Sequence, residues 1–171
     1  IYVPQGWYRI TETLKMKPDT KLIGLHPFGT QFRLDESTAA FSGFGGPKAM
    51  VESSEGGANM LMGIGINTGG YNYRAVGVKW MANADSYMND VKFVGGHGGL
   101  WKPKPGVEEP RGRWNRPARI SSPDNPVAAS GMDLAWDNQY WSLWVTNNGG
   151  GTFKDIWTAS TYACLLYTSP S

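Results

Sequence analysis

The chain has 171 residues and lacks several features that mark common protein classes. Its single cysteine, Cys164, excludes a disulfide within the chain. Only two histidines, His26 and His97, accompany it, which is too few for a histidine and cysteine cluster of the zinc-binding kind. No apolar run approaches the roughly 18 residues of a membrane-spanning helix, so we expect no membrane span. Charged residues make up 18% of the chain and the net charge is +2, which is too small to indicate a nucleic-acid partner.

Glycine, proline and aromatic residues are plentiful instead. The 23 glycines and 11 prolines interrupt nearly every stretch, which argues against a bundle of long helices. Eight Trp, eight Tyr and six Phe supply ample apolar surface to bury, which argues against disorder. Short β-type runs, of about four residues each, alternate with turn residues. The sequence therefore predicts an all-β fold with many short strands.

Two strand–turn–strand units of the chain match each other at a constant offset. Val78 and Val91 belong to the first unit, and Leu143 and Ile156 occupy the same places in the second. An Asn follows the first strand of each unit. A third unit, residues 62–68, has the same form and lies about one coil of a β-helix before the second strand of the first unit. Repetition of one supersecondary unit is typical of a stacked solenoid.

An acidic residue also recurs within the repeat. Asp90 and Asp155 occupy equivalent places, each just before the second strand of its unit. A carboxylate that recurs at the turn of a repeat is more typical of a structural role than of catalysis. We therefore interpret both as turn residues.

Residues 97–131 interrupt the β pattern. They contain six of the eleven prolines, and six Lys or Arg against three acidic residues. Proline removes hydrogen-bond donors from a sheet, so we predict one long inserted loop within a single domain, residues 1–163. The basic side chains of this loop would suit an acidic polysaccharide, and a solvated loop is the alternative.

The last eight residues, 164–171, resemble the translation of a sequencing adapter read through at the end of a short DNA read. We interpret them as a non-native tail and exclude them from fold reasoning. A genuine C-terminal strand is the alternative. Because the chain also opens inside a strand pattern at Ile1, we expect a fragment truncated at both ends.

The opening of the chain carries a recognisable motif. It consists of Tyr2-Val3-Pro4-x-Gly6-x-Tyr8-x-Ile10, then Leu14-x-Met16, then Thr20-x-Leu22-Ile23-Gly24. This pattern resembles the first coil of the right-handed parallel β-helix of the pectate-lyase superfamily, which includes glycoside hydrolase families 55 and 28. The stretch from Trp136 to Trp157 is most similar to family 55.

This resemblance implies a secreted protein, extracellular or periplasmic, that acts on a polysaccharide. The implied activity is that of a polysaccharide-degrading glycoside hydrolase of β-glucanase type. One alternative is a non-catalytic β-helix, either a polysaccharide-binding module or a phage-tailspike shaft. Another is a polysaccharide lyase acting on an acidic glycan. We expect no cofactor, and calcium, which some pectate lyases use, has no ligand set in the sequence to support it.

Asp133, Asp137 and His97 are the candidate catalytic residues. Glycosidases use two carboxylates, about 5 Å apart for retention and about 6.5–9.5 Å apart for inversion. Asp133 and Asp137 flank Trp136, but on one strand they would stand about 13 Å apart, so either would need a partner on a neighbouring coil. His97 lies in Gly95-Gly96-His97-Gly98-Gly99, which is similar to the Gly-His-Gly element of family 28. The acidic residues of that family's signature are absent, and a flexible glycine loop is the alternative.

Tryptophans are the candidate substrate-binding residues, because the C–H faces of sugar rings stack on exposed aromatic side chains. Strand alternation places Leu143 and Val145 on one face and Trp144 on the other, and it sets Trp157 opposite Ile156. The predicted binding residues are Trp144, Trp157, Trp136 and Arg113. A covering loop that buries the tryptophans is the alternative.

Overall fold

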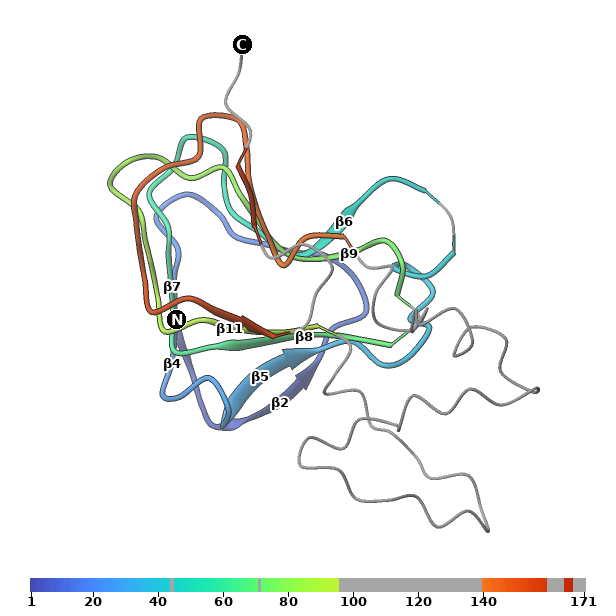
Figure 1. Cartoon of the computed structure of the whole chain (residues 1–171). Coiled ribbons are helices and arrows are strands. Elements are labelled where there is room, and N and C mark those ends of the chain that lie inside the picture. Colours follow the sequence, from blue (N-terminus) through green and yellow to red (C-terminus); the bar gives the residue numbers. More distant parts are fainter. Residues whose placement is uncertain (44, 71, 96–139, 160–164, 168–171) are drawn as a thin grey trace, which may run out of the picture.

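The computed structural model in Figure 1 describes residues 1–43, 45–70, 72–95, 140–159 and 165–167. Over these ranges the chain forms fifteen strands and no helix, and every strand pair is parallel, which confirms the all-β prediction. None of the described residues lies in a helix that is long and apolar enough to cross a membrane.

The strands form three parallel sheets of five strands each. Sheet A contains β1 (Tyr2–Val3), β4 (Lys21–Gly24), β7 (Met60–Met62), β10 (Tyr87–Asn89) and β13 (Thr152–Lys154). Sheet B contains β2 (Gly6–Arg9), β5 (Thr30–Arg33), β8 (Gly65–Gly69), β11 (Lys92–Gly95) and β14 (Trp157–Ala159). Sheet C contains β3 (Leu14–Lys15), β6 (Lys48–Glu52), β9 (Ala75–Trp80), β12 (Leu143–Val145) and β15 (Leu165–Tyr167).

The chain visits sheets A, B and C in turn, so each strand pairs with the strands three places before and after it. We call one passage through the three sheets a coil, and five coils stack on one another. Figure 1 shows the three sheets enclosing a common interior. The arrangement is compatible with a parallel β-helix.

Strand register confirms the spacing of the repeat. Val78 of β9 pairs with Leu143 of β12, as the match between the two units predicts. Ile66 of β8 pairs with Phe93 of β11, so the third unit stands one coil before the second strand of the first unit, as predicted. The second coil is longer, because its connection between β5 and β6 takes up residues 34–47.

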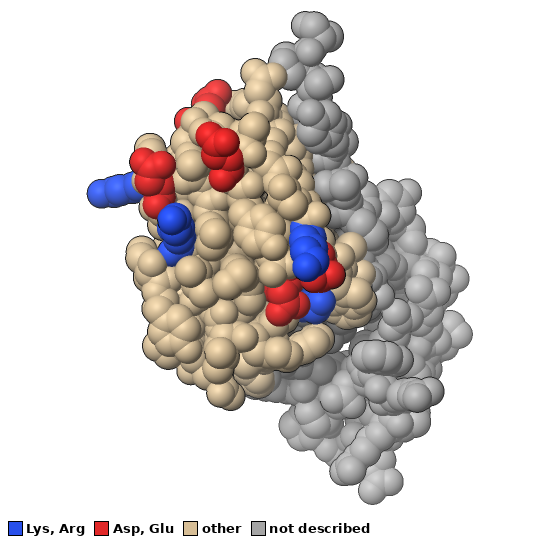
Figure 2. All heavy atoms as spheres, turned by 90° about the vertical axis from the view of Figure 1, so that its left-hand side faces the viewer, with Lys and Arg blue, Asp and Glu red and all other residues tan. Residues whose placement is uncertain are grey.

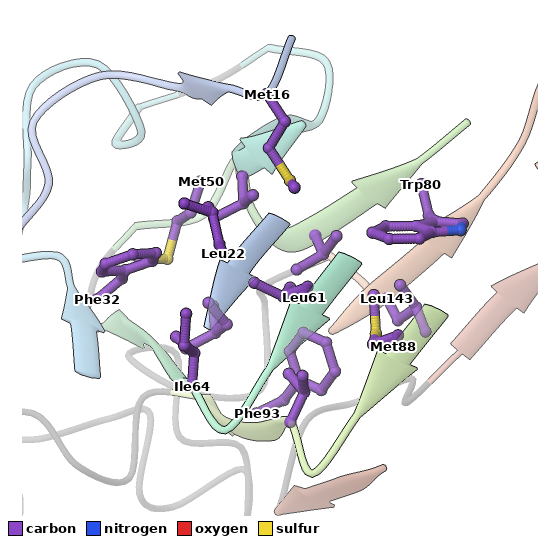
Figure 3. Close-up of a cluster of buried hydrophobic side chains, with 14 of the residues drawn as sticks. Met16, Leu22, Phe32, Met50, Leu61, Ile64, Trp80, Met88, Phe93 and Leu143 are labelled. Carbon is purple, nitrogen blue, oxygen red and sulfur yellow. The ribbon is translucent and has the colours of Figure 1, made fainter. Parts of the chain in front are cut away.

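Inward side chains stack in columns along the coils. On sheet A the column is Leu22–Leu61–Met88, on sheet B it is Phe32–Ile66–Phe93, and on sheet C it is Val51–Val78–Leu143. All nine side chains are buried and belong to one hydrophobic cluster, part of which appears in Figure 3. Burying each large aliphatic or aromatic side chain contributes about 1.5–3 kcal/mol, so these columns are the main source of stability.

In the third, fourth and fifth coils, the corner between sheets A and B is made by one left-handed residue. Gly63, Asp90 and Asp155 occupy this place in three successive coils, with φ values of 63°, 50° and 51°. Glycine adopts this conformation freely, and aspartate tolerates it better than most residues. The prediction that Asp90 and Asp155 are turn residues is therefore confirmed.

Within residues 164–171, the segment Leu165–Tyr167 forms β15, in which Leu165 pairs with Leu143 of β12. The interpretation of this tail as non-native concerns its origin, and it stays a prediction.

Candidate functional site

Most of the predicted site residues fall outside the part of the chain that the structure describes. Their roles stay predictions. They are the catalytic candidates Asp133, Asp137 and His97 and the binding candidates Trp136 and Arg113. Trp144 and Trp157 are described, and they serve as the starting points for the site.

Trp144 lies on the outer face of sheet C. Its neighbours Leu143 and Val145 are only 4% and 2% exposed and point into the core, whereas Trp144 is half-buried on the opposite side. This confirms the predicted alternation along β12. The outward direction follows from strand geometry, because successive side chains of a strand point to opposite faces.

A column of polar and charged residues leads along sheet C to Trp144. Lys15 of β3 pairs with Glu52 of β6, Glu52 pairs with Lys79 of β9, and Lys79 pairs with Trp144 of β12. Neighbouring strands are about 4.8 Å apart, so these four residues occupy four consecutive coils at regular intervals. We call Glu52, Lys79 and Trp144 the sheet C triad.

Trp144 is the first of three aromatic side chains in contact one after another. The ring centroids of Trp141 and Trp144 are 5.6 Å apart, and those of Tyr140 and Trp141 are 5.4 Å apart. The ammonium of Lys79 lies 5.2 Å from the centroid of the Trp144 ring, within the range of a cation–π interaction. The Tyr140 hydroxyl donates a hydrogen bond of 3.3 Å to the carbonyl oxygen of Gly45. Tyr140 and Trp141 therefore add two aromatic side chains next to the triad.

The indole Nε1 of Trp144 is buried and has no hydrogen-bond acceptor among the described residues. Most buried polar groups in proteins have a partner, and one without a partner costs stability. Trp144 therefore adds an unmet hydrogen-bond donor to the aromatic group.

Glu52 is the functional candidate that sequence reasoning missed. It is half-buried between Lys15 and Lys79 in strand register. The carboxylates that the sequence places on or beside predicted strands are aspartates, and Glu52 is not among them. The repeat offered a signal, because one step of it aligns Val51-Glu52 with Val78-Lys79. The described residues place no second carboxylate in this column.

Trp157 lies on a different face from Trp144. It belongs to β14 of sheet B and is 41% exposed, while its neighbour Ile156 is half-buried against the core. The predicted opposition of Trp157 and Ile156 is therefore confirmed. Because the two tryptophans belong to different sheets, they do not share one groove.

The N-terminal end of sheet B carries another exposed tryptophan, Trp7. The guanidinium of Arg33 lies 4.3 Å from the centroid of its ring. Burial lowers the pKa of Arg33, and nearby Asp35 partly offsets that shift. Since the ordinary arginine pKa is far above neutrality, Arg33 stays charged and engaged with Trp7. Asp35 itself forms a 2.7 Å ion pair with Arg9.

The outer face of sheet A is different again. Figure 2 shows this face, where uncharged residues cover most of the surface and the few charged side chains lie in small groups of both signs. In strand register its outward residues are mostly apolar, including Tyr2, Ile23, Met60, Met62 and Tyr87. Its outward columns also contain Lys21 and Lys154, but no described carboxylate pairs with either lysine in strand register.

In the described ranges, no three His, Cys, Asp or Glu side chains come together in a way that could hold a metal ion. Comparisons with protein-family models, with curated proteins and with solved structures found no match. The site is therefore interpreted from its own geometry.

Proposed function

We propose that this chain is part of a right-handed parallel β-helix protein that acts on polysaccharides as a glycoside hydrolase. The sugar chain binds across the outer face of sheet C, and the protein works outside the cytoplasm, in the extracellular space or the periplasm. The observation that carries this proposal is the sheet C triad, in which Glu52, Lys79 and Trp144 stand in strand register on one face.

Each member of the triad suits a different part of a sugar. The ring of Trp144 offers an apolar surface for the C–H face of a pyranose. Lys79 offers hydrogen-bond donors to sugar oxygens. Glu52 supplies one of the two carboxylates that glycoside hydrolysis requires, as the acid or as the base or nucleophile.

The choice of the second carboxylate rests on the sequence alone. Asp133 and Asp137 both precede Leu143, the first residue of β12, by a short stretch of chain. Each of the two aspartates therefore comes before β12, the strand that carries Trp144, in the sequence. This closeness in sequence supports Asp133 or Asp137 as the partner of Glu52.

A polysaccharide lyase is the second candidate, and the two lysines beside Glu52 favour it. Lys15 and Lys79 occupy the coils on either side of Glu52, where they would pair with the carboxylates of an acidic glycan. A lyase needs a base and charge stabilisation of the uronate rather than two carboxylates. The product separates the two reactions, because a lyase leaves an unsaturated uronate.

The test uses the full chain with a soluble neutral β-glucan and, separately, with polygalacturonate. The proposal predicts new reducing ends from the β-glucan without the ultraviolet absorbance of an unsaturated uronate. That absorbance with polygalacturonate would instead establish the lyase. Binding without any product from either polymer would replace the hydrolase with a binding protein.

A matched pair of tryptophan variants ties the activity to sheet C. Trp144→Ala removes the ring of the triad, whereas Trp7→Ala removes an exposed tryptophan on sheet B whose ring is engaged by Arg33. The proposal predicts weaker β-glucan binding for Trp144→Ala and unchanged binding for Trp7→Ala. Equal losses in both variants would contradict the location of the site.

A further inference from the structure

The connection between β4 and β5 crosses the outside of sheet B. It spans residues 25–29, whereas the equivalent connections in the three following coils contain two residues each: 63–64, 90–91 and 155–156. The carbonyl oxygen of Pro27 lies directly over Gly65 of β8, where a Cβ atom would clash with it. We call residues 25–29 the strap.

The strap is held by its own hydrogen bonds. The backbone oxygen of His26 accepts from the amides of Gly29, at 3.0 Å, and Thr30, at 2.8 Å. The imidazole Nδ1 of His26 accepts from the amide of Phe28, at 3.2 Å. Gln31 donates from its side chain to the oxygen of Phe28, at 3.3 Å. These bonds fix the backbone that carries the Phe28 side chain.

Phe28 reaches from the second coil to Trp157 in the fifth. Their ring centroids are 6.4 Å apart with an interplanar angle of 62°, an edge-to-face arrangement. In such an arrangement the rings do not cover each other face to face, and Phe28 and Trp157 remain 54% and 41% exposed. Leu25, in the same strap, is 70% exposed. We call Phe28 and Trp157 the strap cluster.

The charged side chains next to the strap cluster are paired. Lys92, the strand neighbour of Trp157, forms an ion pair of 3.3 Å with Asp90. Lys154 and Asp155, just before Trp157 in the chain, approach to 3.9 Å. An acidic polymer would therefore have to compete with Asp90 and Asp155 for these ammonium groups. The surroundings favour an uncharged ligand.

We propose that the strap cluster is a second binding site, which takes a neutral polysaccharide by stacking sugar rings on Phe28 and Trp157. A sugar ring has an apolar C–H face that matches an exposed aromatic ring, and its hydroxyls remain in water. The site lies on sheet B, on a different sheet from the sheet C triad. This second site goes beyond the proposed function, because the sugar chain binds there without being hydrolysed.

Trp7 provides a matched control on the same sheet. It stands in the same outward column of sheet B as Trp157, at the opposite end, and it is 64% exposed. Its ring is covered on one side by Arg33 at 4.3 Å, and no aromatic partner accompanies it among the described residues. If exposure alone decided sugar binding, Trp7 and Trp157 would bind equally well. The proposal instead predicts binding at Trp157 and none at Trp7.

The experiment measures retention of the full chain and of three variants on an insoluble neutral β-glucan. Phe28→Ala and Trp157→Ala should each lower the affinity about threefold to tenfold, in line with the strength of single aromatic contacts, and Trp7→Ala should not. Thermal unfolding of each variant checks the fold. If Trp157→Ala unfolds, Phe28→Ala decides the result, because Phe28 lies in a connection outside the hydrophobic core.

Several results would overturn the proposal. Among them are failure of the wild-type chain to bind the β-glucan, unchanged binding of a folded Phe28→Ala, or an equal loss in Trp7→Ala. Binding through Phe28 and Trp157 to insoluble cross-linked polygalacturonate but not to β-glucan would overturn the neutral ligand class. Turnover of a short soluble oligosaccharide is measured in parallel. It tests the sheet C triad alone, so either proposal can fail while the other stands.

Discussion

Neighbouring residues of a single strand meet two different environments in this molecule. In β7, Leu61 is fully buried at the centre of its column, while Met60 and Met62 lie half-buried on the outer face of sheet A. In β12, Leu143 is buried in the core, whereas Trp144 belongs to the outer face of sheet C. The interior is uniform from coil to coil, and the three outer faces differ. The inward residues therefore build the fold, and the outward residues are free to differ in chemistry.

The largest expected effect comes from the interior. Leu61→Ala should lower the free energy of unfolding by about 2–5 kcal/mol, because it leaves a cavity in the middle coil. Met60→Ala, one residue earlier on the outer face, should cost clearly less. Chemical denaturation of both variants measures the difference. Similar losses in the two variants would contradict the assignment of the inward and outward sides.

A smaller loss is expected where the strap meets sheet B. Gly65→Ala should cost about 1–3 kcal/mol, because the new methyl group would overlap the carbonyl oxygen of Pro27. Gly6→Ala in β2 is the control, since its Cβ would meet only the Tyr8 ring at an ordinary 3.5 Å. The same denaturation experiment compares them. Equal stability of the two variants would argue against the close passage of the strap.

The corner between sheets A and B offers the next test. Asp90→Val should cost about 1–2 kcal/mol, because a β-branched residue is strained at the left-handed φ of 50°. Asp90→Gly should be tolerated, since Gly63 holds the equivalent corner in the preceding coil. Thermal unfolding distinguishes the two variants. A loss of turnover in a stable Asp90→Gly would show that Asp90 has a chemical role in addition to its turn role.

The smallest effect is expected on the surface. Asp35→Asn breaks the ion pair between Arg9 and Asp35, whose side chains are 70% and 53% exposed. Exposed pairs of this kind contribute about 0.2–1 kcal/mol, so the variant should remain close to the wild type in denaturation. A loss as large as that of Leu61→Ala would mean that outer residues share the structural role of the columns.

The interior could be predicted from the sequence because it repeats. Every coil needs apolar side chains at its inward positions, which is why Val78 matches Leu143 in the sequence. The strand register confirms this match. The left-handed corner could be predicted for the same reason, since Asp90 and Asp155 recur with the coil. Alternation along a strand then placed Leu143 inside and Trp144 outside.

The outer faces could not be predicted in the same way. Glu52 and Lys79 lie a full coil apart in the chain, and their pairing follows from strand register rather than from any local motif. The contact between Phe28 and Trp157 joins the second and fifth coils through an irregular connection that has no counterpart in the repeat. Side chains on these outer faces do not pack into a common core. Their residue types therefore need not repeat from coil to coil, and the sequence shows little periodicity at these positions.

The most direct test of the central claim is turnover of a soluble neutral β-glucan by Glu52→Gln compared with the wild-type chain. The variant keeps the size of the side chain and removes its ability to act as an acid, base or nucleophile. Loss of a positioned acid or base lowers rates by about 10²–10⁴-fold, so we predict at least a hundredfold loss of turnover with binding retained. Unchanged turnover in a folded Glu52→Gln variant would contradict the assignment of the reaction to the outer face of sheet C.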